Sequence, residues 1–312
     1  MQTEITKMLG IKYPLFQGGM AWVSDAELAA AVSNAGGLGI IGAGSARGSW
    51  VREEIKKARK LTTKPFGVNI MLMSPEVEEV VDVVCEERVE VVTTGAGNPG
   101  KYMERFARSE IKVFPIAPTL ALARRLSRYP IAGIIAEGGE AGGHVGDVST
   151  MVLVALLAKE IKTPVIAAGG IADGRGFTAA LALGAEGVQL GTVFVCTQEC
   201  NVHENYKQAI LKAKERSTTV TGKSLNRPVR CLENKLVKEL EKMDREGASP
   251  EEFEKIAAGS LREAVQEGNL ELGSLMAGQS AALINTIKPV GEVIESIISE
   301  AYETRDRLDK FF

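Results

Sequence analysis

The feature that most limits the possible fold is a repeated unit, in which a short apolar run, in most cases ending in glycine, precedes an amphipathic segment. The runs consist largely of Val, Ile and Ala without polar alternation, as expected for parallel strands buried on both faces. Eight such units in succession predict an α/β fold of the (β/α)8 barrel type, a TIM barrel. The eight runs are PLFQGG from Pro14, GLGIIGAG from Gly37, PFGVNIM from Pro65, VEVVTTGAG from Val89, KVFPIA from Lys112, IAGIIAEGG from Ile131, TPVIAAGG from Thr163 and AEGVQLGT from Ala185.

The amphipathic segments carry recognisable helix boundaries. Ser24 and Glu27 have the spacing of a capping box before LAAAVSNA, and Gly36 follows as a stop. In the segment between the seventh and eighth runs, Asp173 is predicted to cap a helix that Gly184 ends. These signals predict helices between the strands.

After the eighth run the sequence changes character. Residues 201–270 are rich in Lys, Glu and Arg and contain no further buried-strand pattern. The segments ENYKQAILKAKER, VKELEKMDREG and PEEFEKIAAGSLREAV predict amphipathic helices, and EVIESIISEAYETRDRL near the end predicts the eighth barrel helix. We therefore expect a barrel formed by 1–200 and 271–312, with a small helical domain, 201–270, inserted after strand eight.

Composition excludes several classes of function. The 37 Lys and Arg against 40 Asp and Glu give a net charge of -3, so no bulk positive field attracts nucleic acid or anionic lipid. The start has no signal-like pattern, and the longest apolar run, VLVALLA, is far shorter than the roughly 18 residues of a membrane span. Four cysteines are too few for a disulfide framework. We expect a cytoplasmic protein with neither nucleic-acid nor membrane partners.

Two motifs are set aside. Gly37, Gly39 and Gly42 satisfy GxGxxG, but a helix precedes them and the apolar run lies inside the motif, whereas a dinucleotide site needs the strand first and the helix after. A second motif, CxxxCxxH, is formed by Cys196, Cys200 and His203, and only the distant Cys231 completes four ligands. We expect no metal site there.

The active site of such a barrel lies at the carboxyl ends of the strands, with phosphate favoured after strands seven and eight. There Gly169 and Gly170 allow backbone N–H groups to approach an anion before a helix N-terminus, and Gly191 and Thr192 add an amide and a hydroxyl. These loops predict a phosphate site. The alternative is that they are ordinary tight turns.

Other strand ends are polar and can bind a ring attached to that phosphate. Strand one ends in QGGMAW and strand three in Asn69, while strand six ends in Glu137 and opens the glycine-rich loop GGEAGGHVG. We expect this loop to be mobile and to bring His144 over the mouth, where an ordinary imidazole pKa of about 6.5 suits proton exchange. His203, in a polar stretch, is interpreted as a surface residue. The ligand is predicted to be flavin mononucleotide (FMN) or a nucleotide.

The motifs QGGMAWVS, NAGGLGIIGAG, GVNIM, EGGEAGGHVG, PVIAAGGIADG and VQLGT resemble those of the FMN-dependent enoyl-acyl-carrier-protein reductases (type II). These belong to the nitronate monooxygenase, or 2-nitropropane dioxygenase-like, superfamily. The resemblance covers about residues 10 to 200 and AGQSAALI. It implies that His144 is the catalytic histidine, and that FMN is bound by Gly19, Met20, Ala21, Asn69, Glu137, Gly143, Gly169, Gly170, Gln189, Gly191 and Thr192.

The resemblance implies NADH-dependent reduction of a trans-2-enoyl group on acyl carrier protein in fatty acid elongation, and it permits a monovalent cation and a homodimer. A nitronate monooxygenase is the alternative enzyme, and a non-catalytic FMN-binding sensor is the alternative outside catalysis. An apolar acyl slot is predicted from Met20, Trp22, Met71 and Met276. A basic set is interpreted either as a solvated helical face or as a docking patch for the acidic carrier: Lys207, Lys212, Lys214, Arg216, Lys223, Arg227 and Arg230.

Overall fold

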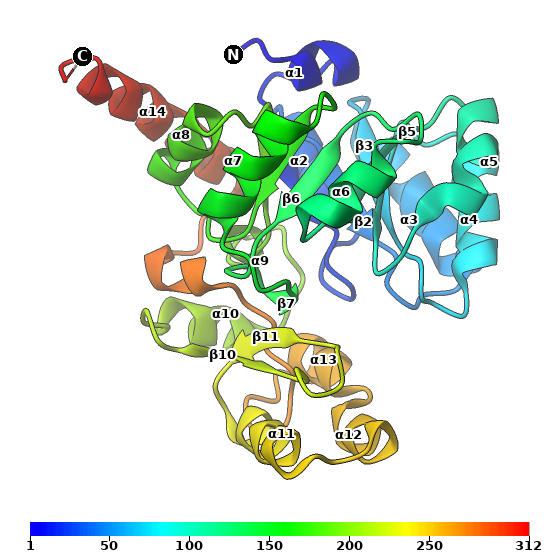
Figure 1. The fold of residues 1–312 in the computed structure, drawn as a ribbon, viewed down its shortest axis with the longest axis vertical. Helices are drawn as coiled ribbons and strands as arrows, with labels where there is room; N and C mark the ends of the chain where they lie inside the picture. The colour runs from blue at the N-terminus through cyan, green and yellow to red at the C-terminus, as the bar shows by residue number, and fades with distance from the viewer. Residues whose placement is uncertain (312) are drawn as a thin grey trace.

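The computed structural model describes residues 1–311 and contains the predicted barrel (Figure 1). Its eight strands pair in the order β1-β9-β8-β6-β5-β4-β3-β2, and all seven pairs are parallel. A parallel bridge between Phe16 and Leu38 joins the first and second strands and closes the ring. The strands are β1 (Leu15–Gln17), β2 (Gly39–Gly42), β3 (Phe66–Met71), β4 (Val91–Gly95), β5 (Lys112–Ala117), β6 (Ile134–Glu137), β8 (Val165–Ala168) and β9 (Gly187–Leu190).

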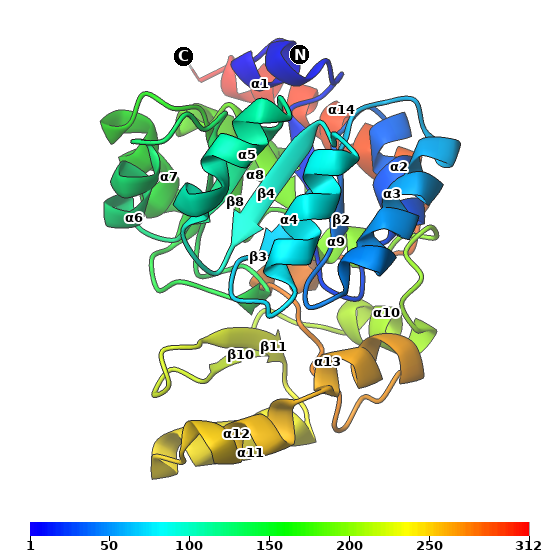
Figure 2. The ribbon, with the colours of Figure 1, turned by 90° about the vertical axis from the view of Figure 1, so that its right-hand side faces the viewer.

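Helices surround this ring, and one further helix covers its amino end. The helix α1 (Glu4–Leu9) places Ile5 and Leu9 in the same buried cluster as the inward-facing Phe16 and Phe114. Figure 2 shows α1 at one end of the barrel and the inserted region at the other. The surrounding helices are α2 (Ala26–Asn34), α3 (Gly48–Leu61), α4 (Val77–Glu86), η1 (Pro99–Tyr102), α5 (Met103–Arg108), α6 (Leu120–Leu126), α7 (Thr150–Glu160), α8 (Gly174–Ala182) and α14 (Val290–Leu308).

One of the two predicted helix caps is confirmed. The Asp173 side chain accepts the N–H of Gly176 and caps α8. The predicted capping box of Ser24 and Glu27 is wrong, because Asp25 is the cap of α2. Ser24 is buried instead, and its hydroxyl accepts hydrogen bonds from Gln17 Nε2 at 2.8 Å and the Met20 N–H at 3.0 Å. The serine thus supports the loop after β1.

The glycines of the GxGxxG motif allow close packing of β2. A Cβ on Gly39 would lie 1.8 Å from the carbonyl oxygen of Ala29 in α2, and one on Gly42 would lie 2.5 Å from the carbonyl oxygen of Met20. Backbone segments therefore occupy the space that side chains would fill. The motif sets the distances from β2 to α2 and to the loop after β1.

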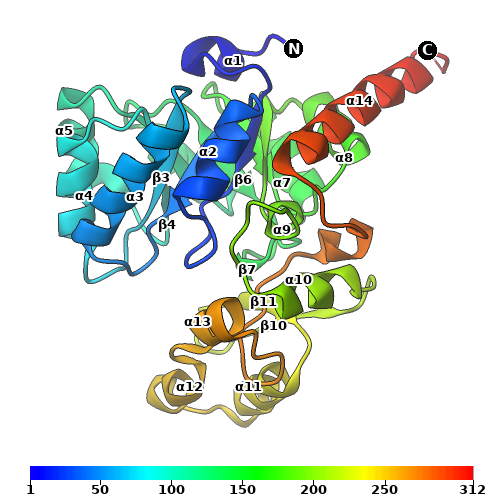
Figure 3. The same cartoon turned by 180° about the vertical axis from the view of Figure 1, so that it is seen from behind.

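The segment between β9 and α14 differs in part from the predicted helical domain. Its strands β10 and β11 form an antiparallel hairpin, and β11 also pairs with β7 (Gly143–His144) of the barrel loop. Runs of four residues, TTVT and VRCL, are too short to show a strand period among charged segments. Figure 3 shows the hairpin below the barrel. The elements are α9 (Thr192–Val195), α10 (Glu204–Leu211), β10 (Thr218–Thr221), β11 (Val229–Leu232), α11 (Lys235–Glu246), α12 (Pro250–Ala257), α13 (Ser260–Arg262), η2 (Glu263–Glu267) and η3 (Gln279–Leu283).

Helix length and hydropathy together decide whether a helix can cross a bilayer. Among the helices of residues 1–311, none combines the length and the apolar character that crossing requires.

Candidate functional site

The strand register places polar side chains at the barrel mouth. Ile135 and Ile166 belong to the inward-facing cluster, so side chains two residues further along β6 and β8 face inward as well. These are Glu137 and Ala168, which are register partners, and Ala168 in turn pairs with Gln189 of β9. The predicted site residues Glu137 and Gln189 therefore share one wall of the mouth.

The opposite wall brings the loop after β1 against Asn69 of β3. Asn69 pairs in register with Thr93, whose hydroxyl donates a 2.9 Å hydrogen bond to Asn69 Oδ1. A Cβ on Gly19 would lie 2.2 Å from the Asn69 Cβ, so Gly19 presents bare backbone beside the amide. Met20 lies next to β2 and directs its sulfur toward Gly191. Residues far apart in sequence thus form one surface, as predicted.

The loops after β8 and β9 offer unpaired amides. Gly169 and Gly170 have φ values of 98° and 74°, a left-handed backbone conformation that favours glycine. None of the hydrogen bonds within residues 1–311 uses the N–H of Gly169, Gly170 or Gly191. The arrangement suits an anion such as phosphate.

The predicted contribution of the following helix is not available, because the first turn of α8 already has acceptors. The Asp173 carboxylate accepts the N–H of Gly176, and Glu300 accepts that of Gly174 at 2.8 Å. The candidate phosphate cradle is therefore formed by loop amides. Thr192 contributes its hydroxyl, which accepts the Gly278 N–H at 3.0 Å and ties this cradle to the segment before η3.

The sequence interpretation missed the residue that braces the loop after β6. Glu140 accepts hydrogen bonds from both the N–H and the hydroxyl of Thr150, each at 2.8 Å. Its carbonyl oxygen accepts the Gln279 N–H at 2.9 Å. The only signal of this role in the sequence is the position of a carboxylate between two pairs of glycines. Thr150 and Gln279, the hydrogen-bond partners of Glu140, become its neighbours only in the folded chain.

His144 lies on the short strand β7. It pairs with Val229 of β11, so the tip of the glycine-rich loop, which is expected to be mobile, is joined to a neighbouring strand. His144 is exposed. Loss of hydration within the surrounding protein and the positive charge of Arg227 both lower the pKa of His144 below the ordinary 6.5. His144 is therefore mostly neutral at pH 7.

The pKa of Glu137 is shifted in the opposite direction, upward. Burial raises the pKa of its carboxyl group to about 7, because no neighbouring group compensates for lost hydration. At neutral pH the site thus holds a carboxyl group near half-protonation together with a neutral imidazole. Such groups match proton exchange near pH 7.

This shift makes stability depend on pH. The folded pKa exceeds the unfolded value, so the contribution of the protonated group is complete below about pH 4.5 and is lost as pH rises through about 7. We expect Glu137→Gln to gain about 1 to 3 kcal/mol in unfolding free energy over the parent between pH 5 and pH 8. Urea unfolding of the apoprotein measures this, with the exposed Glu233→Gln as control. A constant difference across pH would contradict the assignment.

Three of the four cysteines, Cys196, Cys200 and Cys231, are buried, and Cys85 is partly buried. Burial raises the pKa of Cys196 to about 12 and those of Cys200 and Cys231 to about 11, so the thiols are protonated. His203 accepts the Asn205 N–H through Nδ1 and caps α10. Across residues 1–311, no group of three or more His, Cys, Asp or Glu is arranged to hold a metal ion.

Comparison with known proteins agrees with this architecture. FabK from Thermotoga maritima superposes with a TM-score of 0.98 at 49% identity, and the match covers 100% of both chains. A probable nitronate monooxygenase of Staphylococcus saprophyticus is 32% identical, covering 98% of this chain and 99% of its own. A Rhodococcus jostii (3aS,4S,5R,7aS)-5-hydroxy-7a-methyl-1-oxo-octahydro-1H-indene-4-carboxyl-CoA dehydrogenase is 30% identical, covering 99% and 98%.

The family comparison spans nearly the whole chain. The nitronate monooxygenase model matches residues 2–82 and 76–300, which include every strand of the barrel and the inserted region. With the barrel, the polar mouth and His144 in place, the chain is an oxidoreductase that belongs to the nitronate monooxygenase family.

Proposed function

We propose that the protein is an FMN- and NADH-dependent enoyl-acyl-carrier-protein reductase that acts in fatty acid elongation. The observation that carries this proposal is the full-length similarity to FabK, an enoyl-acyl-carrier-protein reductase II, at 49% identity against 32% for a probable nitronate monooxygenase. The Rhodococcus relative supports a thioester substrate, since its name describes a carboxyl-CoA compound.

The residues of the mouth fit FMN. Three free amides and Thr192 suit its phosphate, and bare backbone at Gly19 beside Asn69 suits a flat ring. FMN, when bound, supplies the two-electron chemistry between NADH and the enoyl double bond. The further contacts expected at Ala21 and Gly143 lie on these same loops, after β1 and β6.

The chain's own contribution to reduction is placement and polarisation of the thioester. A neutral His144 donates a hydrogen bond to the thioester carbonyl, which gains negative charge in the transition state. As a proton donor to the α-carbon, His144 would first need protonation, which its lowered pKa disfavours at pH 7. Met20 and Met276 border the mouth at Gly191 and Gly143 and offer apolar contact for the acyl chain.

The second candidate is nitronate oxidation, and the same imidazole favours it. A neutral histidine is a competent base for removing a proton from a nitroalkane. The two functions separate when the flavoprotein reduced by NADH without oxygen is mixed with crotonyl thioester, and the oxidised flavoprotein is mixed with a nitronate, which would donate electrons to the flavin. Fast reoxidation of the reduced flavin by the thioester supports the reductase. Fast reduction of the oxidised flavin by the nitronate, with turnover in oxygen and no reaction with the thioester, would replace it, and no reduction by either NADH or nitronate would favour a sensor.

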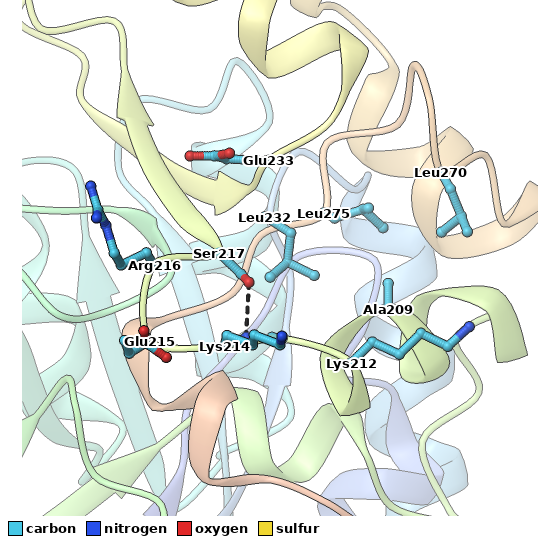
Figure 4. Close-up of a pocket in the computed structure, with 11 residues that line it drawn as sticks. Ala209, Lys212, Lys214, Glu215, Arg216, Ser217, Leu232, Glu233, Leu270 and Leu275 are labelled. Atoms are coloured by element: carbon cyan, nitrogen blue, oxygen red, sulfur yellow. Dashed lines mark hydrogen bonds between the residues drawn. The ribbon is translucent and has the colours of Figure 1, made fainter.

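An acidic carrier protein needs a basic surface, and the seven basic residues of the sequence analysis do not form one face. Lys207 is buried and donates to the Thr197 carbonyl oxygen at 2.7 Å, while Arg230 turns to the barrel. Lys212, Lys214 and Arg216 are exposed and line a surface groove of about 540 Å³. Figure 4 shows the leucines that also line the groove, which come from β11 and from the segment before η3. We place carrier docking there.

The groove and the mouth share one backbone segment. Leu275 lines it, and the next residue, Met276, packs its sulfur against Gly143. The triple reversal Lys212→Glu, Lys214→Glu, Arg216→Glu should raise the KM for carrier-linked substrate about tenfold and spare a coenzyme A thioester, with a loss that shrinks at high salt. Reversal of the exposed Lys235, Lys238 and Lys242 on α11 is the control. Equal effects on both substrates would refute docking at this groove.

A further inference from the structure

The loop that carries His144 is attached to the inserted region at two points. At its tip, Gly143 and His144 pair in antiparallel register with Arg230 and Val229 of β11, and the Val145 N–H donates to the Pro228 carbonyl oxygen at 3.1 Å. The strand β11 is itself held by β10. The imidazole is therefore carried by β7 of the barrel loop, whose partner strand β11 belongs to the inserted region.

The second attachment is the side chain of Arg230. Its Nε and one terminal nitrogen donate to the Gly139 carbonyl oxygen at 3.1 and 2.9 Å, and the other terminal nitrogen donates to Thr218 Oγ1 at 3.0 Å. Gly139 lies at the base of the loop, which the Gly139 N–H closes by donating to the Val148 carbonyl oxygen at 2.8 Å. One guanidinium thus joins β10, β11 and the base of the loop.

The contact between Arg230 and Gly139 lies in a partly buried environment. Arg230 is half-buried, and desolvation lowers its pKa while the charge of Glu140 opposes that change. Below the loop, the Met276 carbonyl oxygen accepts a 2.7 Å hydrogen bond from the buried Tyr206 hydroxyl. The loop therefore contacts Met276 at Gly143 and Arg230 at Gly139, and each of these two residues is hydrogen-bonded to a further part of the chain.

We propose that Arg230 is a positioning residue for His144, so that the inserted region sets where the imidazole stands in the barrel mouth. This rests on the catalytic role of His144 proposed above. The guanidinium does not touch the reacting atoms. It fixes the base of the loop while β11 fixes the tip, and a planar fork with several donors holds such a geometry where a single ammonium cannot.

The test is Arg230→Met, which keeps much of the length and removes the donors. We expect retained FMN, faster hydrogen exchange of the peptide 138–148 in the holoenzyme, and a kcat lower by about tenfold to a hundredfold, as displacement of a catalytic group entails. The pKa of His144, followed by imidazole NMR titration, should rise toward its ordinary value as the displaced ring gains hydration and leaves Arg227. Arg230→Lys should restore part of the activity and protection.

The matched control is Arg245→Met, an exposed arginine of α11 that makes no hydrogen bond or ion pair within residues 1–311. It should match the parent in every measurement. Unchanged exchange at 138–148 and an unchanged His144 titration in Arg230→Met would overturn the proposal, as would a lower melting temperature with no selective change in this loop. Exchange and titration do not depend on the substrate, so failure of the reductase assignment stays distinguishable.

Discussion

Gly170→Asp is expected to yield a protein that folds but copurifies with little FMN. The new carboxylate would add a negative charge beside the unpaired amides of Gly169, Gly170 and Gly191, and its Cβ would lie 3.2 Å from the Cβ of Glu140. A hydrogen bond to a charged group contributes about 1.5 to 3 kcal/mol, so losing one and adding like-charge repulsion should weaken FMN binding by about 10²-fold or more. Fluorescence titration of the apoprotein with FMN measures this.

The control must separate charge in the cradle from backbone strain. Gly170 has φ 74°, and any side chain there is strained. Gly247, the C-cap of α11, has φ 72°, and a Cβ added there would have no atom within 4 Å, so Gly247→Asp repeats the strain and charge away from the mouth. It should keep its FMN. Equal FMN loss in both variants, or parental binding by Gly170→Asp, would remove the phosphate from this cradle.

The barrel could be predicted from sequence because its information is local and repeated. Each strand is an apolar run that differs clearly in pattern from the amphipathic helix after it. Eight such strand–helix repeats are typical of one closed fold, the (β/α)8 barrel. The walls of the mouth followed from the same reasoning, since polar residues stand at or near the ends of those runs: Glu137 ends β6, and Asn69 lies two residues before the end of β3, where the sequence analysis places the end of the strand.

The parts that the sequence did not predict depend on contacts between distant segments. The strand pairing of His144 with Val229 requires two short segments far apart in the chain, neither of which has a strand period of its own. Asp25 displaced the predicted cap because Ser24 was used by Gln17, a contact that exists only after β1 and α2 pack. Arg230 looked like one member of a solvated basic set and became a loop anchor. The sequence showed which residues could take part in chemistry, but it did not show which residues they would contact in the folded chain.

His144→Ala should retain FMN and lose about 10²-fold or more in the rate at which enoyl thioester reoxidises the reduced flavin. Reduction by NADH should fall less, because that step needs no group on the thioester carbonyl. The residue is exposed on a strand held by β11, so its removal leaves the cradle and the barrel core untouched. Stopped-flow absorbance of the two half-reactions measures both rates. Reoxidation at the parent rate would leave His144 outside the chemistry.

The pH dependence of the same half-reaction decides which role the imidazole has. The pKa of His144 lies below 6.5, so a reaction that needs the protonated ring should slow about tenfold for each pH unit above that pKa. In the Glu137→Gln background, which removes the carboxyl group whose pKa is about 7, a neutral ring that donates a hydrogen bond to the carbonyl keeps the rate level from about pH 7 to 9. His144→Gln also distinguishes the two roles, because the glutamine amide can donate a hydrogen bond but cannot act as an acid near neutral pH. A level profile with partial rescue by glutamine is expected; a falling profile without rescue would make His144 the proton donor.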